Sequence, residues 1–206
     1  MKIETLVIAT HNKGKVAEFE KLLAGTGIIL KSAADFNLPE PEETEETFVG
    51  NALLKARAAV EMTGLPCLAD DSGLEISILD GAPGVYSARW AETPSGERDF
   101  NFAMQRVHDA VAKSKAGPIN GTQTANFRAV LALVFPGGQF ELFEGWMDGR
   151  LCWPPRGDNG HGYDPIFVPD NYDISFAEMT AEEKNKTSHR GFAVQKFRDY
   201  LLKNAA

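Results

Sequence analysis

The stretch Leu65-Pro-Cys-Leu-Ala-Asp-Asp-Ser-Gly-Leu-Glu-Ile-Ser-Ile78 sets two adjacent carboxylates, Asp70 and Asp71, between two apolar runs. The runs at 68–69 and 74–78 favour two short β-strands that the acidic pair interrupts. Carboxylates at an apolar edge are costly to desolvate unless something neutralises them. A hard divalent cation with oxygen ligands is one solution. The stretch therefore indicates a candidate metal site.

The length and composition are those of an ordinary globular protein. The 206 residues suit one domain over 1–206, built as one large body or two small lobes. A net charge of −8 argues against a general nucleic-acid binder but leaves a nucleotide substrate open. Cys67 and Cys152 make neither a disulfide framework nor a zinc site. The apolar run at the N-terminus is too short for a signal peptide, so we expect a cytoplasmic protein.

The first loop joins a β-branched run at 5–10 to an amphipathic helix. Its sequence is Thr10-His-Asn-Lys-Gly-Lys15, and Asn12 suits the helix N-cap. A polar glycine loop at a helix N-terminus can present backbone N–H groups to a phosphate. The alternative is a capped helix with solvated lysines.

An acidic segment, 39–46, precedes the helix expected from about Thr47 to Met62. The segment is either a solvated loop that leads into the helix or the source of a glutamate that folds back to a metal. Asn51 and Lys55 share one face of the helix at a spacing of four residues. Gly64 ends the helix.

The remaining pattern mixes strands and helices. We expect a strand at 27–32, a helix at 97–114, a hairpin of strands 126–136 and 139–150, a glycine-rich loop at 154–165, a helical turn at 180–185 and a last helix that opens at 188–191. This order predicts a mixed α/β fold. It would have a twisted central mixed sheet flanked by helices, with two lobes and a substrate cleft between them.

Six motifs in order closely resemble the inosine triphosphate pyrophosphatase family, over nearly the whole chain. They are Thr10–Lys15, Glu42-Glu-Thr44 with Phe48–Ala56, Ala69–Gly73, Gly81–Arg89, Gly162–Pro165 and Ser188–Gly191. The family hydrolyses dITP, ITP and XTP to the monophosphate and pyrophosphate, uses Mg²⁺ and is usually a homodimer. The resemblance implies the same activity and cofactor here, with a nucleotide substrate and no nucleic-acid or membrane partner.

The resemblance also implies roles for single residues. Asp71 is the expected catalytic carboxylate and a metal ligand, and Glu42 is the second metal ligand, with Glu43 as the alternative. The expected substrate-binding residues are Thr10, His11, Asn12, Lys13, Gly14, Lys15, Lys55, Ser72, His161, Gly162, Tyr163, Asp164, Lys184, His189 and Arg190. The metal, held with or without Asp70, would activate a water that attacks the α-phosphorus.

The base loop departs from the family at one position. Relatives commonly read Phe-Gly-Tyr-Asp, whereas this chain has His161-Gly-Tyr-Asp164. Imidazole still stacks on a base, but it is smaller and titratable. Two other functions remain open: a pyrophosphatase for modified pyrimidine nucleotides, and a regulatory module that binds a nucleotide without turnover.

Overall fold

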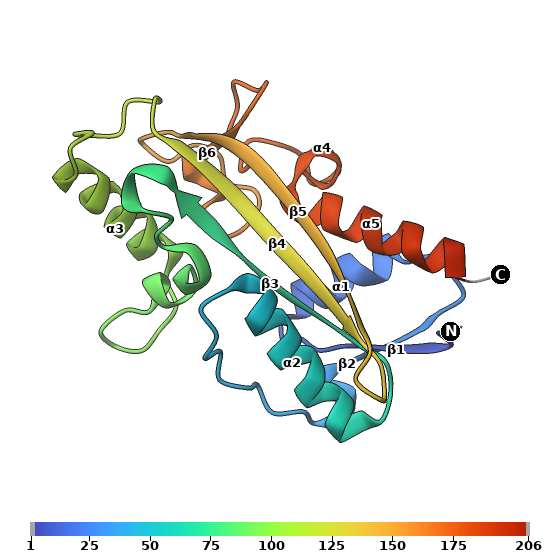
Figure 1. Cartoon of the computed structure of the whole chain (residues 1–206). Helices are drawn as coiled ribbons and strands as arrows, with labels where there is room; N and C mark the ends of the chain where they lie inside the picture. Colours follow the sequence, from blue (N-terminus) through green and yellow to red (C-terminus); the bar gives the residue numbers. More distant parts are fainter. Residues whose placement is uncertain (1–2, 205–206) are drawn as a thin grey trace. The chain divides into compact units, whose positions relative to one another are not determined.

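The computed structural model describes residues 3–204, except the side chains of Lys13, Glu18 and Leu22. Strands and helices alternate along the chain from β1 to β4, after which β5 and β6 follow and then two helices (Figure 1). In order they are β1 Thr5–Ile8, α1 Lys13–Leu22, β2 Ile29–Ser32, α2 Phe48–Thr63, β3 Cys67–Ile76, α3 Phe100–Lys113, β4 Thr124–Val134, β5 Phe140–Leu151, β6 Phe167–Pro169, α4 Ala181–Thr187 and α5 His189–Asn204.

The six strands form one sheet in the order β2-β1-β3-β4-β5-β6. β1 pairs in parallel with both β2 and β3, whereas β5 and β6 are antiparallel. The expected mixed α/β fold is therefore confirmed. The predicted turn between β4 and β5 is present, since the Phe135 N–H donates to the Gln139 carbonyl at 2.9 Å. Gly137 and Gly138 both have positive φ there, which side chains disfavour.

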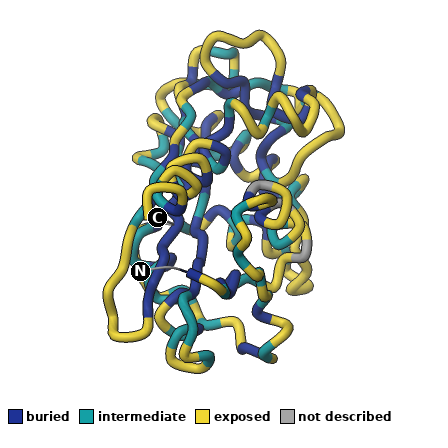
Figure 2. The backbone as a smooth tube through the Cα atoms, turned by 90° about the vertical axis from the view of Figure 1, so that its right-hand side faces the viewer, coloured by how far each residue is buried: buried dark blue, intermediate teal, exposed yellow. Residues whose placement is uncertain are grey.

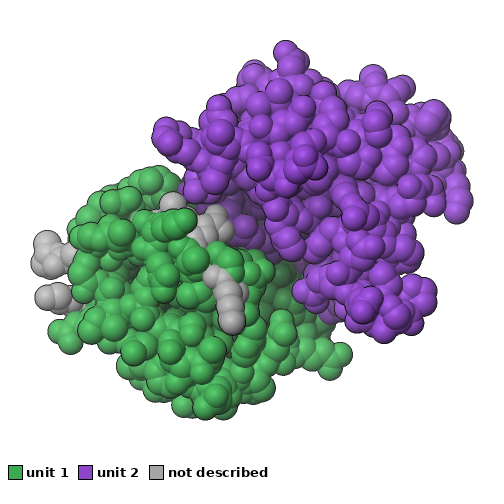
Figure 3. Space-filling view, turned by 180° about the vertical axis from the view of Figure 1, so that it is seen from behind, with its two compact units in different colours: residues 1–71, 129–144, 193–206 green, residues 72–128, 145–192 purple. Residues whose placement is uncertain are grey.

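The chain divides into two compact units (Figure 3). Unit 1 comprises residues 1–71, 129–144 and 193–206, and unit 2 comprises 72–128 and 145–192. Strands β3, β4 and β5 each contribute residues to both units. None of the helices within 3–204 is both long and apolar enough to cross a membrane.

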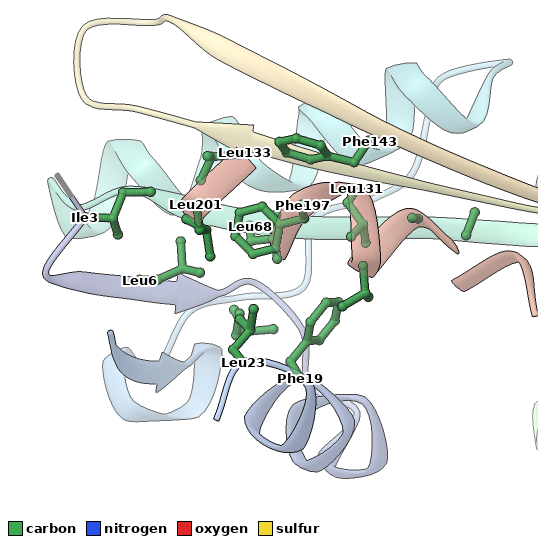
Figure 4. Packing of buried hydrophobic residues seen from close by; sticks show 14 of the residues in the cluster. Ile3, Leu6, Phe19, Leu23, Leu68, Leu131, Leu133, Phe143, Phe197 and Leu201 are labelled. Atoms are coloured by element: carbon green, nitrogen blue, oxygen red, sulfur yellow. The ribbon is translucent and has the colours of Figure 1, made fainter. Parts of the chain in front are cut away.

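In unit 1 the strands carry a different apolar cluster on each face. Leu6 of β1 and Leu68 of β3 pack with Phe19 of α1 and Phe197 of α5 (Figure 4). Alternate strand residues, including Val7 and Cys67, pack instead with Ala59 of α2. Successive side chains of a strand point to opposite faces. One face of this part of the sheet is thus covered by α1 and α5, and the other by α2.

The core of unit 2 contains apolar residues from several helices and strands and from the loop that carries Tyr163. α3 contributes four buried residues at helical spacing, as its sequence predicts. They pack with β3, β4, β5 and the segment around β6. Figure 2 shows the buried residues along the backbone. The cluster includes Leu74, Ile76, Ala103, Met104, Val107, Val111, Phe127, Leu151, Tyr163, Phe167 and Phe176.

The structure corrects one prediction about the acidic stretch. The two expected strands around Asp70 and Asp71 are one continuous strand, β3, which runs through both carboxylates. Ile78 does not extend it, because residues 77–79 form a short 3-10 turn in which Ile78 is exposed. The carboxylates therefore belong to the middle of a buried strand and not to a loop.

Candidate active site

Asp70 and Asp71 lie on opposite faces of β3. Asp70 shares the face of Leu68, which α1 covers, and Asp71 shares the face of Cys67, which α2 covers. Both aspartates are buried. Each one meets a lysine from the helix that covers its face. The adjacent acids therefore pair with different lysines.

Lys15 of α1 neutralises Asp70. Its Nζ lies 2.7 Å from Asp70 Oδ2, and the Asp70 side chain is only 2% exposed. Lys15 stands four residues before Phe19, which packs against the same face of the sheet. The ion pair thus follows from the helical spacing. It gives Asp70 a partner other than a metal.

Lys55 of α2 joins two carboxylates. Its Nζ lies 3.1 Å from Asp71 Oδ1 and 2.5 Å from Glu43 Oε1. Burial raises the pKa of Asp71 to about 6, although the Lys55 ammonium opposes this shift. Burial lowers the pKa of Lys55, but the nearby carboxylates outweigh it and leave that pKa above its ordinary value. Lys55 therefore stays charged, while Asp71 is a stronger base than an exposed aspartate.

The Asp71 carboxylate has the features that a magnesium ligand needs. Its second oxygen, Oδ2, is buried and has no hydrogen-bond partner among the described residues. A buried acceptor of this kind is costly unless a donor or cation reaches it. Within the described part of the chain, no three His, Cys, Asp or Glu side chains form a metal-binding group by themselves. Mg²⁺ usually takes one or two carboxylates and completes its shell with water and substrate phosphates. The residues present fit that pattern.

For the second carboxylate the geometry favours Glu43 over Glu42. Glu43 shares Lys55 with Asp71, whereas Glu42 is exposed. Asn51, which was not among the predicted site residues, helps to hold this loop. Asn51 is buried, and its Oδ1 accepts a hydrogen bond from the Glu45 N–H at 3.0 Å. Asn51 stands one helical turn before Lys55, which is the only signal in the sequence for this role.

The first loop caps its helix with a side chain. Asn12 Oδ1 accepts from the N–H groups of Gly14 and Lys15 at 2.9 and 3.2 Å, as expected for an N-cap. Two of the N–H groups proposed for a phosphate are therefore already bonded. Thr10 lies at the start of this loop, where its Oγ1 accepts from the Asn12 N–H. His11 is exposed, and the predicted contribution of the Lys13 side chain lies outside the described residues.

In unit 2, Asp164 organises the predicted base loop. Its buried Oδ2 accepts from the His161 N–H at 2.6 Å and also receives the Lys184 ammonium. Gly160 has φ +81°, and a Cβ there would lie 2.1 Å from Asp164 Oδ2. The loop can close around Asp164 only because residue 160 is glycine. Lys184 is thus brought to this loop, and its predicted contact with substrate stays a prediction.

Tyr163 points inward and anchors the same loop. Its hydroxyl donates to the Ser87 carbonyl at 2.8 Å, and burial raises the pKa of the phenol well above its ordinary value. Ser87 Oγ in turn accepts from the Leu74 N–H, which ties the loop to β3. Gly162 lies beside the Phe100 ring. Tyr163 is therefore a support of the loop, and its predicted contact with substrate stays a prediction.

Three more predicted residues lie at the start of α5 and on β3. Arg190 Nη2 donates to Ser72 Oγ at 3.2 Å, which joins two of the proposed nucleotide contacts. His189 is buried and stacks on Phe127, with ring centroids 4.7 Å apart and planes at 9°. Gly191 lets the start of α5 lie close to the Asn185 carbonyl, since a Cβ at residue 191 would lie 1.9 Å from that oxygen.

Cys67 and Cys152 are both free thiols. Burial raises the pKa of Cys67 to about 11, so its thiol is not a nucleophile at neutral pH. Cys67 instead packs as a small apolar residue in the core of unit 1.

Comparison with known proteins places these groups in a family. Residues 6–200 match the model of the Ham1 family. The chain is 58% identical over 195 residues to a dITP/XTP pyrophosphatase of Ruegeria pomeroyi, with 94% of this chain and 93% of the relative covered. It is 51% identical to a dITP/XTP pyrophosphatase of Agrobacterium fabrum, with 96% of each chain covered. The solved structure of a HAM1 protein from Coxiella burnetii superposes with a TM-score of 0.89 at 37% identity, covering 98% of this chain and 100% of that one.

Proposed function

The chain belongs to the Ham1 family, and on this premise we propose that it clears non-standard purine nucleotides from the nucleotide pool. It is a dITP/XTP pyrophosphatase, a nucleoside triphosphate hydrolase. The substrates would be dITP, ITP and XTP, and the products the monophosphate and pyrophosphate. The observation that carries this proposal is the buried carboxylate of Asp71. One of its oxygens lies on Lys55, and the other has no hydrogen-bond partner within the part of the chain that the structure describes.

The proposed reaction is attack of water on the α-phosphorus. Asp71, a buried carboxylate, is the proposed acceptor of the proton of the attacking water. The ammonium groups of Lys15, Lys55 and Lys184 bind phosphate oxygens and stabilise the charge on the departing pyrophosphate. Each of these lysines already sits beside a carboxylate, which sets its position before substrate arrives. Thr10 to Gly14 would add polar contacts to the triphosphate.

Asp71 and Glu43 would hold the Mg²⁺ that we propose as cofactor, with Glu42 as the alternative suggested by the resemblance. When bound, magnesium supplies positive charge to phosphate oxygens and acidifies water. Asp70 has no part in this proposal, since Lys15 neutralises it on the other face of β3.

The base would be read by the residues of unit 2. Hypoxanthine and xanthine carry a 6-oxo acceptor where adenine carries an amino donor. Arg190 and His189 would donate to the oxo group, and adenine would leave these donors unmatched, which can discriminate strongly. His161 would stack on the purine, and Ser72 and the backbone from Gly162 to Asp164 would border the nucleotide.

A substrate panel tests this function directly. ITP, XTP, dITP, ATP and GTP would be hydrolysed side by side with Mg²⁺, and pyrophosphate and orthophosphate would be assayed separately. We expect pyrophosphate, mainly from ITP, XTP and dITP. Reaction in ¹⁸O-water would then show the phosphorus attacked, because attack at the α-phosphorus puts the label in the monophosphate.

Each other outcome contradicts a defined part of the proposal. Orthophosphate as the main product would mean attack at the γ-phosphorus, and label in pyrophosphate would mean attack at the β-phosphorus. Equal rates on all purines would remove the assignments in the base loop. Turnover of modified pyrimidine nucleotides instead would favour the rival enzyme. Binding of ITP without product would favour a regulatory module.

Two properties of the intact protein are also proposals. We propose a homodimer, which sedimentation at micromolar concentration would test. We also propose that the protein acts in the cytoplasm, where its nucleotide substrates are made, and cell fractionation would test this.

A further inference from the structure

Phe100 places an aromatic ring against the proposed base loop. It is the first residue of α3, directly after the N-cap Asp99. Phe100 stands four residues before the buried Met104, on the same face of the helix. Its ring therefore continues the apolar face of α3 beyond the core, where it is only half-buried.

The Phe100 ring contacts both aromatic residues of the loop. Its centroid lies 4.7 Å from the His161 ring, with the planes at 72°, and 5.6 Å from the Tyr163 ring, with the planes at 81°. Both are edge-to-face arrangements, which aromatic pairs favour. Gly162 lies between these two residues in the sequence and also faces the Phe100 ring. A Cβ at residue 162 would lie 3.6 Å from Phe100 Cε1. One ring thus lies against three successive residues.

The two loop residues differ in burial. Tyr163 is buried and anchored by its hydroxyl, whereas His161 is exposed as a residue. The His161 backbone is held by Asp164, but this bond does not orient the imidazole. The contact with the Phe100 ring orients the imidazole, because an edge-to-face contact depends on the angle between the planes of the two rings. Whichever ring supplies the edge, at least one face of the imidazole remains outside this contact.

From this geometry we propose that Phe100 is a positioning residue for base recognition. It holds the His161 imidazole in an orientation that can stack on the purine of the substrate. This inference rests on the proposed function, and in particular on His161 as a base contact. Fixing the ring in advance reduces the conformational freedom lost when the base binds. Since imidazole is smaller than a phenyl ring, its contact with the base depends more strongly on orientation.

The test compares Phe100→Leu with Phe100→Tyr and with Phe102→Leu. Phe100→Leu keeps an apolar side chain but removes the ring, so KM for ITP should rise by about five- to tenfold with little change in kcat. Phe100→Tyr keeps the ring and should restore the KM of the native protein. Phe102 lies on the same helix, half-buried and beside Arg106, so Phe102→Leu should leave KM unchanged.

Inorganic pyrophosphate separates positioning of the base from general damage, because it carries no base. Its inhibition constant should be the same in Phe100→Leu as in the native protein. In a His161→Ala background, Phe100→Leu should change KM no further, because the two residues act through one ring.

The possible results distinguish a failure of this inference from a failure of the proposed function. An unchanged KM in Phe100→Leu, an equal rise in the inhibition constant of pyrophosphate, or additive effects with His161→Ala would each overturn the inference while leaving the proposed function intact. Absence of ITP turnover in the native protein would contradict the proposed function itself, and the inference with it.

Discussion

Two adjacent aspartates in this chain have different environments. Asp70 pairs with Lys15 of α1, and Asp71 pairs with Lys55 of α2. The alternation of a strand sends them to opposite faces, so identical side chains one residue apart meet different helices. We therefore expect Asp71 to act in the reaction and Asp70 to hold Lys15 in place. Substituting one aspartate at a time can distinguish these two roles.

The first prediction compares Asp71→Asn with Asp70→Asn. Asp71→Asn removes the proposed general base, so kcat for ITP should fall by at least about 100-fold. Asp70→Asn changes the opposite face and should keep kcat within about tenfold of the native value. Single-turnover hydrolysis at saturating ITP measures both. Similar losses of kcat in the two variants would show that the aspartates act as one site.

The second prediction concerns pH in metal-free protein. Burial raises the pKa of Asp71 from 3.8 to about 6, so the folded state binds more protons than the unfolded state between these values. Asp71 therefore stabilises the fold at low pH relative to neutral pH. As pH rises from 4 to 7, the native protein should lose on the order of 2–3 kcal/mol relative to Asp71→Asn.

Urea unfolding of both proteins in chelator, across this pH range, measures the difference. Comparison with Asp71→Asn cancels the titration of all other groups that the substitution leaves unchanged. A difference that stays constant with pH, or that moves in favour of the native protein, would contradict the raised pKa.

The short helix α4 begins with a capping box that helps to position the charged side chain of Lys184. Thr180 Oγ1 accepts from the Glu183 N–H, and Glu183 Oε2 accepts from the Thr180 N–H at 2.8 Å, which together make a capping box. The helix that follows has only seven residues, so this start sets its orientation. It directs Lys184 to Asp164 and leaves Lys186 in solvent with Glu182.

The third prediction uses these two lysines as a matched pair. Lys184→Met leaves the buried Asp164 without its cation and should lower the free energy of unfolding by about 2–3 kcal/mol. Methionine still covers Phe176, over which the Lys184 ammonium lies at 5.5 Å, so lost packing contributes little. Lys186→Met removes an exposed pair and should cost less than about 1 kcal/mol.

Chemical unfolding measures both values, and Lys184→Met should also raise KM for ITP. The same small loss in both variants would mean that Asp164 does not depend on Lys184.

For the whole molecule, the important fact is that three strands run through both units. β3, β4 and β5 each have residues in unit 1 and in unit 2, so neither unit is a separate stretch of chain. We therefore expect one cooperative unfolding transition. The three tryptophans, at 90, 146 and 153, all lie in unit 2, so their fluorescence reports on that unit alone. Far-ultraviolet circular dichroism reports on the helices of both units.

The fourth prediction places a defect in unit 1 and observes unit 2. Leu6 is fully buried in unit 1, and Leu6→Ala should destabilise the protein by about 2–4 kcal/mol. The fluorescence and dichroism midpoints should shift together. Leu202→Ala, at a position 61% exposed, is the control and should change neither. A fluorescence midpoint that stays in place while dichroism shifts would show that the units unfold separately.

Much of the fold follows from local patterns in the sequence. Helical spacing predicts α2 and α3, Asn12 and Gly64 mark helix ends, and the pair Gly137-Gly138 marks the hairpin. The order of the motifs points to the family that the comparisons confirm. These features are readable because a turn, a cap or an apolar stripe depends on residues only a few positions apart.

The pairing of charges was decided by the tertiary structure. The sequence left open whether Asp70 joins Asp71 at a metal, and in the structure Asp70 pairs with Lys15, which is 55 residues away. The resemblance implied Glu42 as the second metal ligand, with Glu43 as the alternative, and it is Glu43 that the structure brings to Lys55. The sequence gave no sign that Phe100 meets His161. Such contacts depend on which helix covers which face of a sheet and how each loop closes. By itself the sequence determines the elements and the chemistry available, and long-range packing determines which residues act together.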